Sequence, residues 1–288
     1  MTYSRTTADE VCQAFAAGAR LDLAGAEVPA VLLVGLLVGT PLHAEGRIPA
    51  LRLAGAAIRG RLELPGATVP ALVELTGCTF DEPIDLYAAE LTGWRLARCA
   101  LPGLQAANLR MRSELTLENC TVTGPVMLPD ARIEGPLRLL GTRLETAGGH
   151  ALVGVRLMIS GVLDARELHA DDEIRLSGAR IDGNIDLRGA RLAHPGGDAL
   201  EASGAQIGGN LRCDRGFTAH PGLHRRPARR TTGTAGRLNQ AVARCPGRHD
   251  RQGHLRQPRV HRHRGRAAQP RRSVEVGELR RRPARWTR

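Results

Sequence analysis

Small and large apolar residues recur at fixed spacing through the middle of this chain, and this repeat constrains the fold more than any other feature. One series of leucines is spaced by 11 residues, at Leu53, Leu64, Leu75 and Leu86. A second series has the same spacing, at Ile58, Val69, Phe80 and Leu91. A small residue stands two positions before each member of the second series. Repeats of this kind indicate a solenoid, whose units bury their apolar faces only against their neighbours.

The repeated unit is a β-strand with a turn rather than a helix. An 11-residue apolar period also occurs in helical coiled coils. Here, however, each repeat carries glycine, and prolines stand at 65, 70, 83, 102, 125, 129 and 136. In a helix interior, a glycine costs about 1 kcal/mol and a proline about 3 kcal/mol. A left-handed hexapeptide β-helix needs a constant period of six, whereas these steps alternate between five and six. The pattern predicts a β-helix of about seven coils.

A longer internal sequence repeat predicts two protruding loops. Residues 128–163 align without gaps to residues 176–211 at an offset of 48. If a coil holds about 21–22 residues, this offset is two coils plus an insertion. The insertions lie at 146–150 and 193–198, and because they share a phase we expect them on one face, about 10 Å apart. We predict that these loops form an interaction surface. Its candidate residues are Thr146, Gly148, His150, His194, Gly196 and Asp198.

No catalytic, metal or cofactor site is predicted. A weak metal or ligand site between His150 and His194 is one hypothesis, but exposed polar residues are ordinary beside Gly-Gly turns. The consecutive acids 171–173 are interpreted as a solvated turn rather than an acid/base pair, because alternate side chains of a strand face opposite ways. Three cysteines spaced by 21, at Cys78, Cys99 and Cys120, are expected to stack as buried thiols, with a metal or redox ladder as the alternative.

The repeat also carries a family resemblance. The segments 75–80 (LTGCTF), 86–91 (LYAAEL) and 186–192 (DLRGARL) resemble pentapeptide-repeat proteins. This resemblance covers about residues 51–213 and implies a right-handed, four-sided β-helix, although the steps of five and six depart from the strict family period of five. Segment 47–56 (RIPALRLAGA) is similar to a group of actinobacterial proteins labelled "membrane-associated oxidoreductase". That resemblance implies an oxidoreductase activity.

The ends of the chain differ from its middle. Residues 1–46 are expected to form a helical cap, with helices at 6–18 and from Pro29 to about Val38. The apolar run at 28–39 has 12 residues, fewer than the roughly 18–20 that span a bilayer. No transmembrane segment or secretory leader is predicted, so we expect a cytoplasmic protein, with peripheral membrane association as an alternative.

The C-terminal tail is strongly basic. The solenoid is expected to occupy 47–217 and the tail 218–288, where the repeat stops. Residues 221–288 contain 20 arginines and three acids, whereas residues 1–220 contain 21 arginines and 26 acids. Such a tail lacks the apolar residues of a core and is predicted to be disordered. The tail is either a nucleic-acid-binding arm or the translation product of a GC-rich gene read out of frame. The repeat stops in the middle of a coil, which favours the second interpretation.

The function predicted from these features is that of a non-catalytic protein-interaction scaffold with an unidentified protein partner. No GxGxxG stands between a strand and a helix, and no phosphate-binding loop occurs. Lysine is absent, which excludes lysine Schiff-base chemistry. Three alternatives stay open: the oxidoreductase implied by the resemblance, nucleic-acid binding through the tail, and a homodimer formed through the open end of the solenoid.

Overall fold

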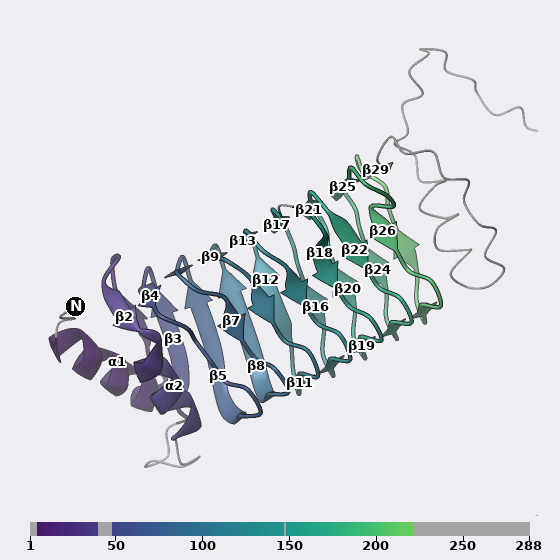
Figure 1. Cartoon of the computed structure of the whole chain (residues 1–288). Helices are drawn as coiled ribbons and strands as arrows, with labels where there is room; N and C mark the ends of the chain where they lie inside the picture. Colours follow the sequence, from purple (N-terminus) through teal and green to yellow (C-terminus); the bar gives the residue numbers. More distant parts are fainter. Residues whose placement is uncertain (1–4, 40–47, 147, 222–288) are drawn as a thin grey trace, which may run out of the picture. The chain divides into compact units, whose positions relative to one another are not determined.

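The computed structural model describes residues 5–39, 48–146 and 148–221. These residues form a parallel β-solenoid of about seven turns, preceded by two short helices (Figure 1). The predicted fold class, a mainly β solenoid with a helical N-terminal segment, is confirmed. The tail predicted at 218–288 lies outside the described residues from 222 onward.

Each coil has four sides, which we number in the order in which the chain passes through them. Short strands on each side pair in parallel with the equivalent strands of the neighbouring coils. Side 1 contains β11 (Arg110–Met111), β15 (Arg132–Ile133), β19 (Met158–Ile159), β23 (Arg180–Ile181) and β27 (Gln206–Ile207). Side 2 contains β1 (Arg20–Asp22), β3 (Ala50–Ala54), β12 (Leu115–Glu118), β16 (Leu137–Arg138), β20 (Leu163–Asp164), β24 (Ile185–Asp186) and β28 (Leu211–Arg212). Two longer strands, β5 (Thr68–Thr76) and β8 (Glu90–Ala97), continue from side 1 to side 2.

The other two sides complete the coil. Side 3 contains β2 (Glu27–Pro29), β4 (Ala57–Arg59), β6 (Thr79–Phe80), β9 (Ala100–Leu101), β13 (Thr121–Val122), β17 (Arg143–Leu144), β21 (His169–Ala170), β25 (Arg191–His194) and β29 (Thr218–Pro221). Side 4 contains β7 (Ile84–Asp85), β10 (Leu104–Gln105), β14 (Val126–Met127), β18 (His150–Val153), β22 (Glu173–Arg175) and β26 (Leu200–Glu201). The 11-residue spacing read from the sequence therefore corresponds to half a coil.

The core is a set of apolar columns inside the solenoid. On side 4, for example, the column Ile84, Leu104, Val126, Leu152 and Ile174 is formed by strand partners on successive coils, and every member is buried. Because side chains alternate along a strand, the next residue of each strand points outward. Burial of each large aliphatic side chain contributes about 1.5–3 kcal/mol, so stacking of successive coils supplies the driving force of the fold.

Two of the four corners require a residue in the left-handed region, which explains the regular glycines. At the corner between sides 2 and 3, Gly55, Gly77, Gly141 and Gly189 have positive φ. The corner between sides 4 and 1 has the same requirement, met by Gly66 and Gly178. Only glycine adopts this conformation without a steric cost. Several coils nevertheless place other residues there, among them Ala88 and Arg98, at φ 52° and 53°.

The N-terminal helices lie where they were expected. Helix α1 spans Arg5–Ala17 and α2 spans Ala30–Val38, with Pro29 immediately before α2. Strands β1 and β2 between them were not predicted from the sequence, and they pair with β3 and β4 to begin the solenoid. Neither helix in the described part of the chain is long and apolar enough to cross a membrane.

The three stacked cysteines are buried, as predicted. The exposed fractions of Cys78, Cys99 and Cys120 are 0%, 2% and 1%. Each thiol donates to the carbonyl of a side 2 leucine in the preceding coil, with Cys99 Sγ 3.4 Å from Leu75 O. Thr142 continues the column, and its hydroxyl donates in the same way to Leu117 O at 2.8 Å. The column therefore has a structural hydrogen-bonding role that a hydroxyl fulfils equally well.

Candidate interaction site at the loop corner

Both insertions lie at the corner between sides 3 and 4, in coils on either side of one shorter coil. Leu152 follows Leu144 by eight residues, and Leu200 follows Leu192 by eight. In the coil between them, Ile174 follows Ala170 by only four residues. The two loops are thus four residues longer than the corner that separates them. We call residues 145–149 loop 1 and residues 195–199 loop 2.

Asp172 of the intervening coil contacts elements of both neighbouring coils. Its Oδ2 accepts hydrogen bonds from the Thr146 hydroxyl at 2.7 Å and from the backbone N–H of Gly148 at 2.9 Å. Its Oδ1 lies 3.2 Å from Nδ1 of His194, the residue that precedes loop 2. The Asp172 side chain is only 5% exposed. One buried carboxylate therefore joins three successive coils at this corner.

The hydrogen bonds determine the ionisation of Asp172. Burial by itself raises the pKa of this carboxyl, but the hydrogen bonds from Thr146, Gly148 and His194 outweigh burial, so its pKa is lowered. Asp172 is therefore a carboxylate at neutral pH. An ionised acceptor makes stronger hydrogen bonds than a neutral one, which favours a fixed position for loop 1 and for His194.

Glu173 forms a second buried contact beside the first. Its Oε2 lies 2.7 Å from His150 Nδ1 and 3.3 Å from an Arg175 guanidinium nitrogen. The Glu173 side chain is 10% exposed, whereas that of His150 is 37% exposed. His150 and His194 thus use the same ring nitrogen toward a buried carboxylate from the central coil.

The structure places four of the six sequence-predicted residues against the two buried acids. Thr146, Gly148 and His194 converge on Asp172, and His150 contacts Glu173. Gly196 lies beside the His194 ring, where an added Cβ would stand 3.5 Å from Nε2. Asp198 is exposed.

The expectation of a solvated turn at 171–173 is wrong for two of its three residues. Asp171 is exposed, but Asp172 and Glu173 are buried. Burial follows from position, because this corner is the short one between two long loops that cover it. The only signal in the sequence was the absence of an insertion in the coil that carries these acids.

No group of three His, Cys, Asp or Glu side chains arranged for a metal ion occurs among the described residues. The two histidines approach different carboxylates on opposite sides of the central coil.

The exposed rim of the corner is acidic. Glu145 of loop 1, Asp171 of the central coil and Asp198 of loop 2 are all exposed. None of them has an ion-pair partner within 4.0 Å among residues 5–39, 48–146 and 148–221. Unpaired carboxylates on a fixed surface attract a positively charged partner and repel an acidic one.

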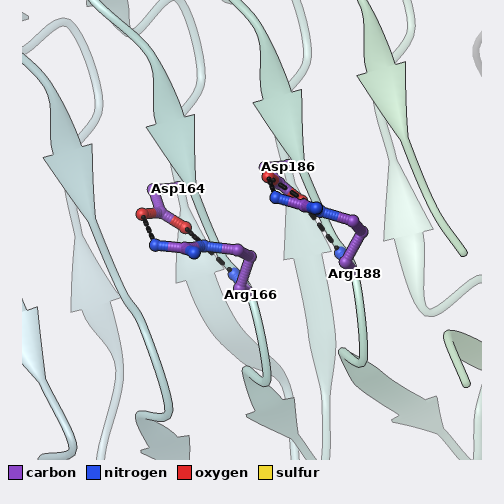
Figure 2. Close-up of polar contacts among 4 residues, drawn as sticks. All are labelled: Asp164, Arg166, Asp186 and Arg188. Atoms are coloured by element: carbon purple, nitrogen blue, oxygen red, sulfur yellow. Dashed lines mark hydrogen bonds and ion pairs between the residues drawn. The ribbon is translucent and has the colours of Figure 1, made fainter. Parts of the chain in front are cut away.

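Side 2 illustrates the opposite arrangement, in which charges are satisfied within the fold. Figure 2 shows Asp164 with Arg166 and Asp186 with Arg188, on neighbouring coils. Each arginine binds the aspartate two residues before it through two guanidinium nitrogens, at 2.8 Å for both bonds of Arg166. Farther along the same side, Glu114 bridges Arg95 and Arg138. Because these charges have intramolecular partners, side 2 is a weaker candidate for binding than the loop corner.

Comparisons of the chain with protein-family models, curated proteins and solved structures found no match. The parallel β-solenoid of the described residues is consistent with a pentapeptide-repeat-like β-helix.

Proposed function

We propose that this protein is a non-catalytic interaction scaffold and that the loop corner between sides 3 and 4 is its binding surface. The observation that carries the proposal is the attachment of loop 1 and of His194 to the single carboxylate of Asp172. A surface held in one conformation before binding loses less conformational entropy when a partner docks. The solenoid supports the binding surface rigidly, and the two loops give that surface its shape.

The chemistry of the corner defines the kind of partner. Three unpaired acids surround it, and two glycines in each loop leave the backbone open to close approach. The His150 and His194 rings add polar groups at the centre. A protein surface with arginine or lysine side chains fits this combination.

Shortening the loops tests the proposal, because the central coil provides a native template for a tight corner. Deleting four residues from each loop, 146–149 and 195–198, reduces both long coils to the length of the central one. Proteins captured by the wild-type chain and confirmed by purified reconstitution should no longer bind the shortened protein. A matched control, Arg143→Gln on side 3 beside loop 1, should retain binding. Equal binding by all three proteins would contradict the proposal, as would catalytic turnover by the purified chain.

Nucleic-acid binding through the tail is a second proposal, supported by the 20 arginines against three acids in residues 221–288. Strand β29 extends to Pro221, so a truncation that preserves the solenoid ends there rather than at residue 217. Binding that weakens steeply with salt and disappears on this truncation would support a role for the tail. Binding that survives truncation would refute it.

A further inference from the structure

The middle of side 4 carries a row of uncharged residues, of which Gln105 and Met127 are partly exposed and Val153 is buried, with 7% of its surface exposed. The outward positions of successive coils on this side are Glu63, Asp85, Gln105, Met127, Val153, Arg175 and Glu201. Charged residues thus occupy both ends of the row, and Gln105, Met127 and Val153 occupy its centre. We call these three residues, together with the corner residues described next, the side 4 band.

The adjoining corner extends the band toward side 1. Backbone hydrogen bonds between coils align Tyr87, Ala107, Pro129 and Val155 in one column. Tyr87 is 52% exposed, and the other three are partly exposed. Four successive coils therefore present apolar side chains at this corner, next to the uncharged part of the row. A contiguous apolar area on a polar surface marks an interaction site.

We propose that the side 4 band docks against the same band of a second copy of this chain, with the two solenoids antiparallel. The order of charges along the row indicates that the partner on the side 4 band is a second copy of the chain. Asp85 lies two coils before Met127, and Arg175 lies two coils after it. A two-fold axis along the strand direction at Met127 reverses the coil order. It therefore places Asp85 of each copy opposite Arg175 of the other.

The same axis pairs the rest of the row consistently. Met127 faces Met127 of the second copy, and Gln105 faces Val153. A two-fold interface uses one patch twice, so self-complementarity of this kind is what it requires. The outermost acids, Glu63 and Glu201, face each other only at the rim, where solvent and salt screen their repulsion.

The size of the band predicts a weak dimer. Seven coils at about 4.8 Å per coil give a row about 30 Å long. A face this narrow buries less than the roughly 1,600 Å² of a standard interface. We therefore expect a dissociation constant in the micromolar range, with monomer and dimer in exchange.

Sedimentation of the nuclease-treated full chain over a micromolar concentration series tests the proposal. The wild type should dimerise, and Met127→Glu should weaken dimerisation at least about tenfold, because it places a charge at the centre of the interface. Met158→Glu is the matched control, since Met158 is 41% exposed but lies on side 1. A chain that stays monomeric throughout would overturn the proposal, as would a dimer that Met127→Glu leaves intact.

A charge exchange tests the antiparallel pairing itself. Asp85→Arg and Arg175→Glu should each weaken the dimer, and the double variant should restore it. Arg175 also lies 3.3 Å from Glu173 Oε2, so Arg175→Gln is the variant that removes the charge without placing a carboxylate beside Glu173. Because Asp85 accepts the backbone N–H of Tyr87 at 2.9 Å, Asp85→Asn serves as a second variant that keeps the turn acceptor and removes only the charge. Thermal unfolding of each variant establishes that it folds. Failure of the double variant to recover the dimer, with each protein folded, would contradict the antiparallel arrangement.

Discussion

Asp172 of one coil and Thr146 of the preceding coil are joined by a hydrogen bond of 2.7 Å between Oδ2 and Oγ1. The two residues are 26 positions apart in the sequence, and the bond closes across the corner where the solenoid departs from its regular coil length. It is one of three contacts through which a single carboxylate holds structure from both neighbouring coils.

Removing the Asp172 carboxylate should destabilise the protein. Asp172→Ala removes the ionised acceptor of the hydrogen bonds from the Thr146 hydroxyl and the Gly148 N–H, and a hydrogen bond to a charged group contributes about 1.5–3 kcal/mol. Denaturant unfolding measures the change in free energy. Asp171→Ala is the neighbouring control, because Asp171 is exposed and makes no ion pair within the described chain; it should change stability by less than about 0.5 kcal/mol. Equal effects of the two substitutions would be inconsistent with a special role for Asp172.

Stability should fall in acid, and Asp172 should account for part of the loss. The pKa values of Asp172, Asp186 and Glu201 are all lowered in the folded protein, because hydrogen bonds to each carboxylate outweigh its burial. A lowered carboxyl pKa contributes stability above the unfolded value of about 4, and this contribution is lost as the pH falls through the folded value. Melting temperature measured from neutral pH to pH 2 should decrease below about pH 4. Asp172→Asn should show a shallower decrease, and an unchanged profile would refute its contribution.

At corner positions with positive φ, introducing glycine should raise the stability of the protein and replacing glycine should lower it. Ala88→Gly should stabilise the protein by up to about 1 kcal/mol, because it relieves the cost of a side chain at positive φ. Gly77→Ala should destabilise it by about 1–2 kcal/mol, since Gly77 has a φ of 62° and no neighbouring atom closer than 4.0 Å to an added Cβ. Ala107→Gly, at a corner position without positive φ, should not stabilise. Thermal unfolding of the three variants distinguishes these outcomes.

Glycine is also required where successive coils touch at the corner between sides 1 and 2. A Cβ added to Gly183 would lie 2.5 Å from the carbonyl oxygen of Gly161. Gly183→Ala should therefore destabilise the fold by about 1–3 kcal/mol through overpacking. In contrast, Gly35 in α2 has nothing within 4 Å of an added Cβ, so Gly35→Ala should stabilise by about 1 kcal/mol. Chemical denaturation measures both effects, and the same sign for both would contradict the packing described.

The stacked cysteines should be inert in the folded protein. The hydrogen bond with the Cys120 side chain and the burial of the thiol raise the pKa of Cys99 to about 11, whereas the same hydrogen bond lowers the pKa of Cys120. Burial is therefore what protects Cys120 from the reagent. Alkylation of the native protein at pH 8 should modify the half-buried Cys12 and spare Cys78, Cys99 and Cys120 until the chain unfolds. Cys120→Thr should be tolerated, because Thr142 makes the equivalent bond in the next coil. Rapid native labelling of the column would support a redox function instead.

The fold was predictable because its determinants repeat along the sequence. Stacked leucines, left-handed glycines and the 48-residue echo each recur with the coil, so the number of coils and the two long loops could be derived from spacing alone. The strands β1 and β2 were missed because each has only three residues, and two short strands between helices carry no periodic signal. The roles of Asp172 and Glu173 were missed for a different reason. Their burial depends on which coil lies next to which loop, and this relationship exists only after the coils have stacked.

Amide hydrogen exchange at Gly148 is the most direct test of the claim that Asp172 holds the loop corner in one conformation. Gly148 is exposed, so its N–H is protected only by the bond to Asp172 Oδ2 at 2.9 Å. We expect slow exchange in the wild type and fast exchange in Asp172→Ala, and His194→Ala should also accelerate exchange although residue 194 belongs to a different coil. Exchange at the rate of an unstructured glycine in the wild type would contradict the account.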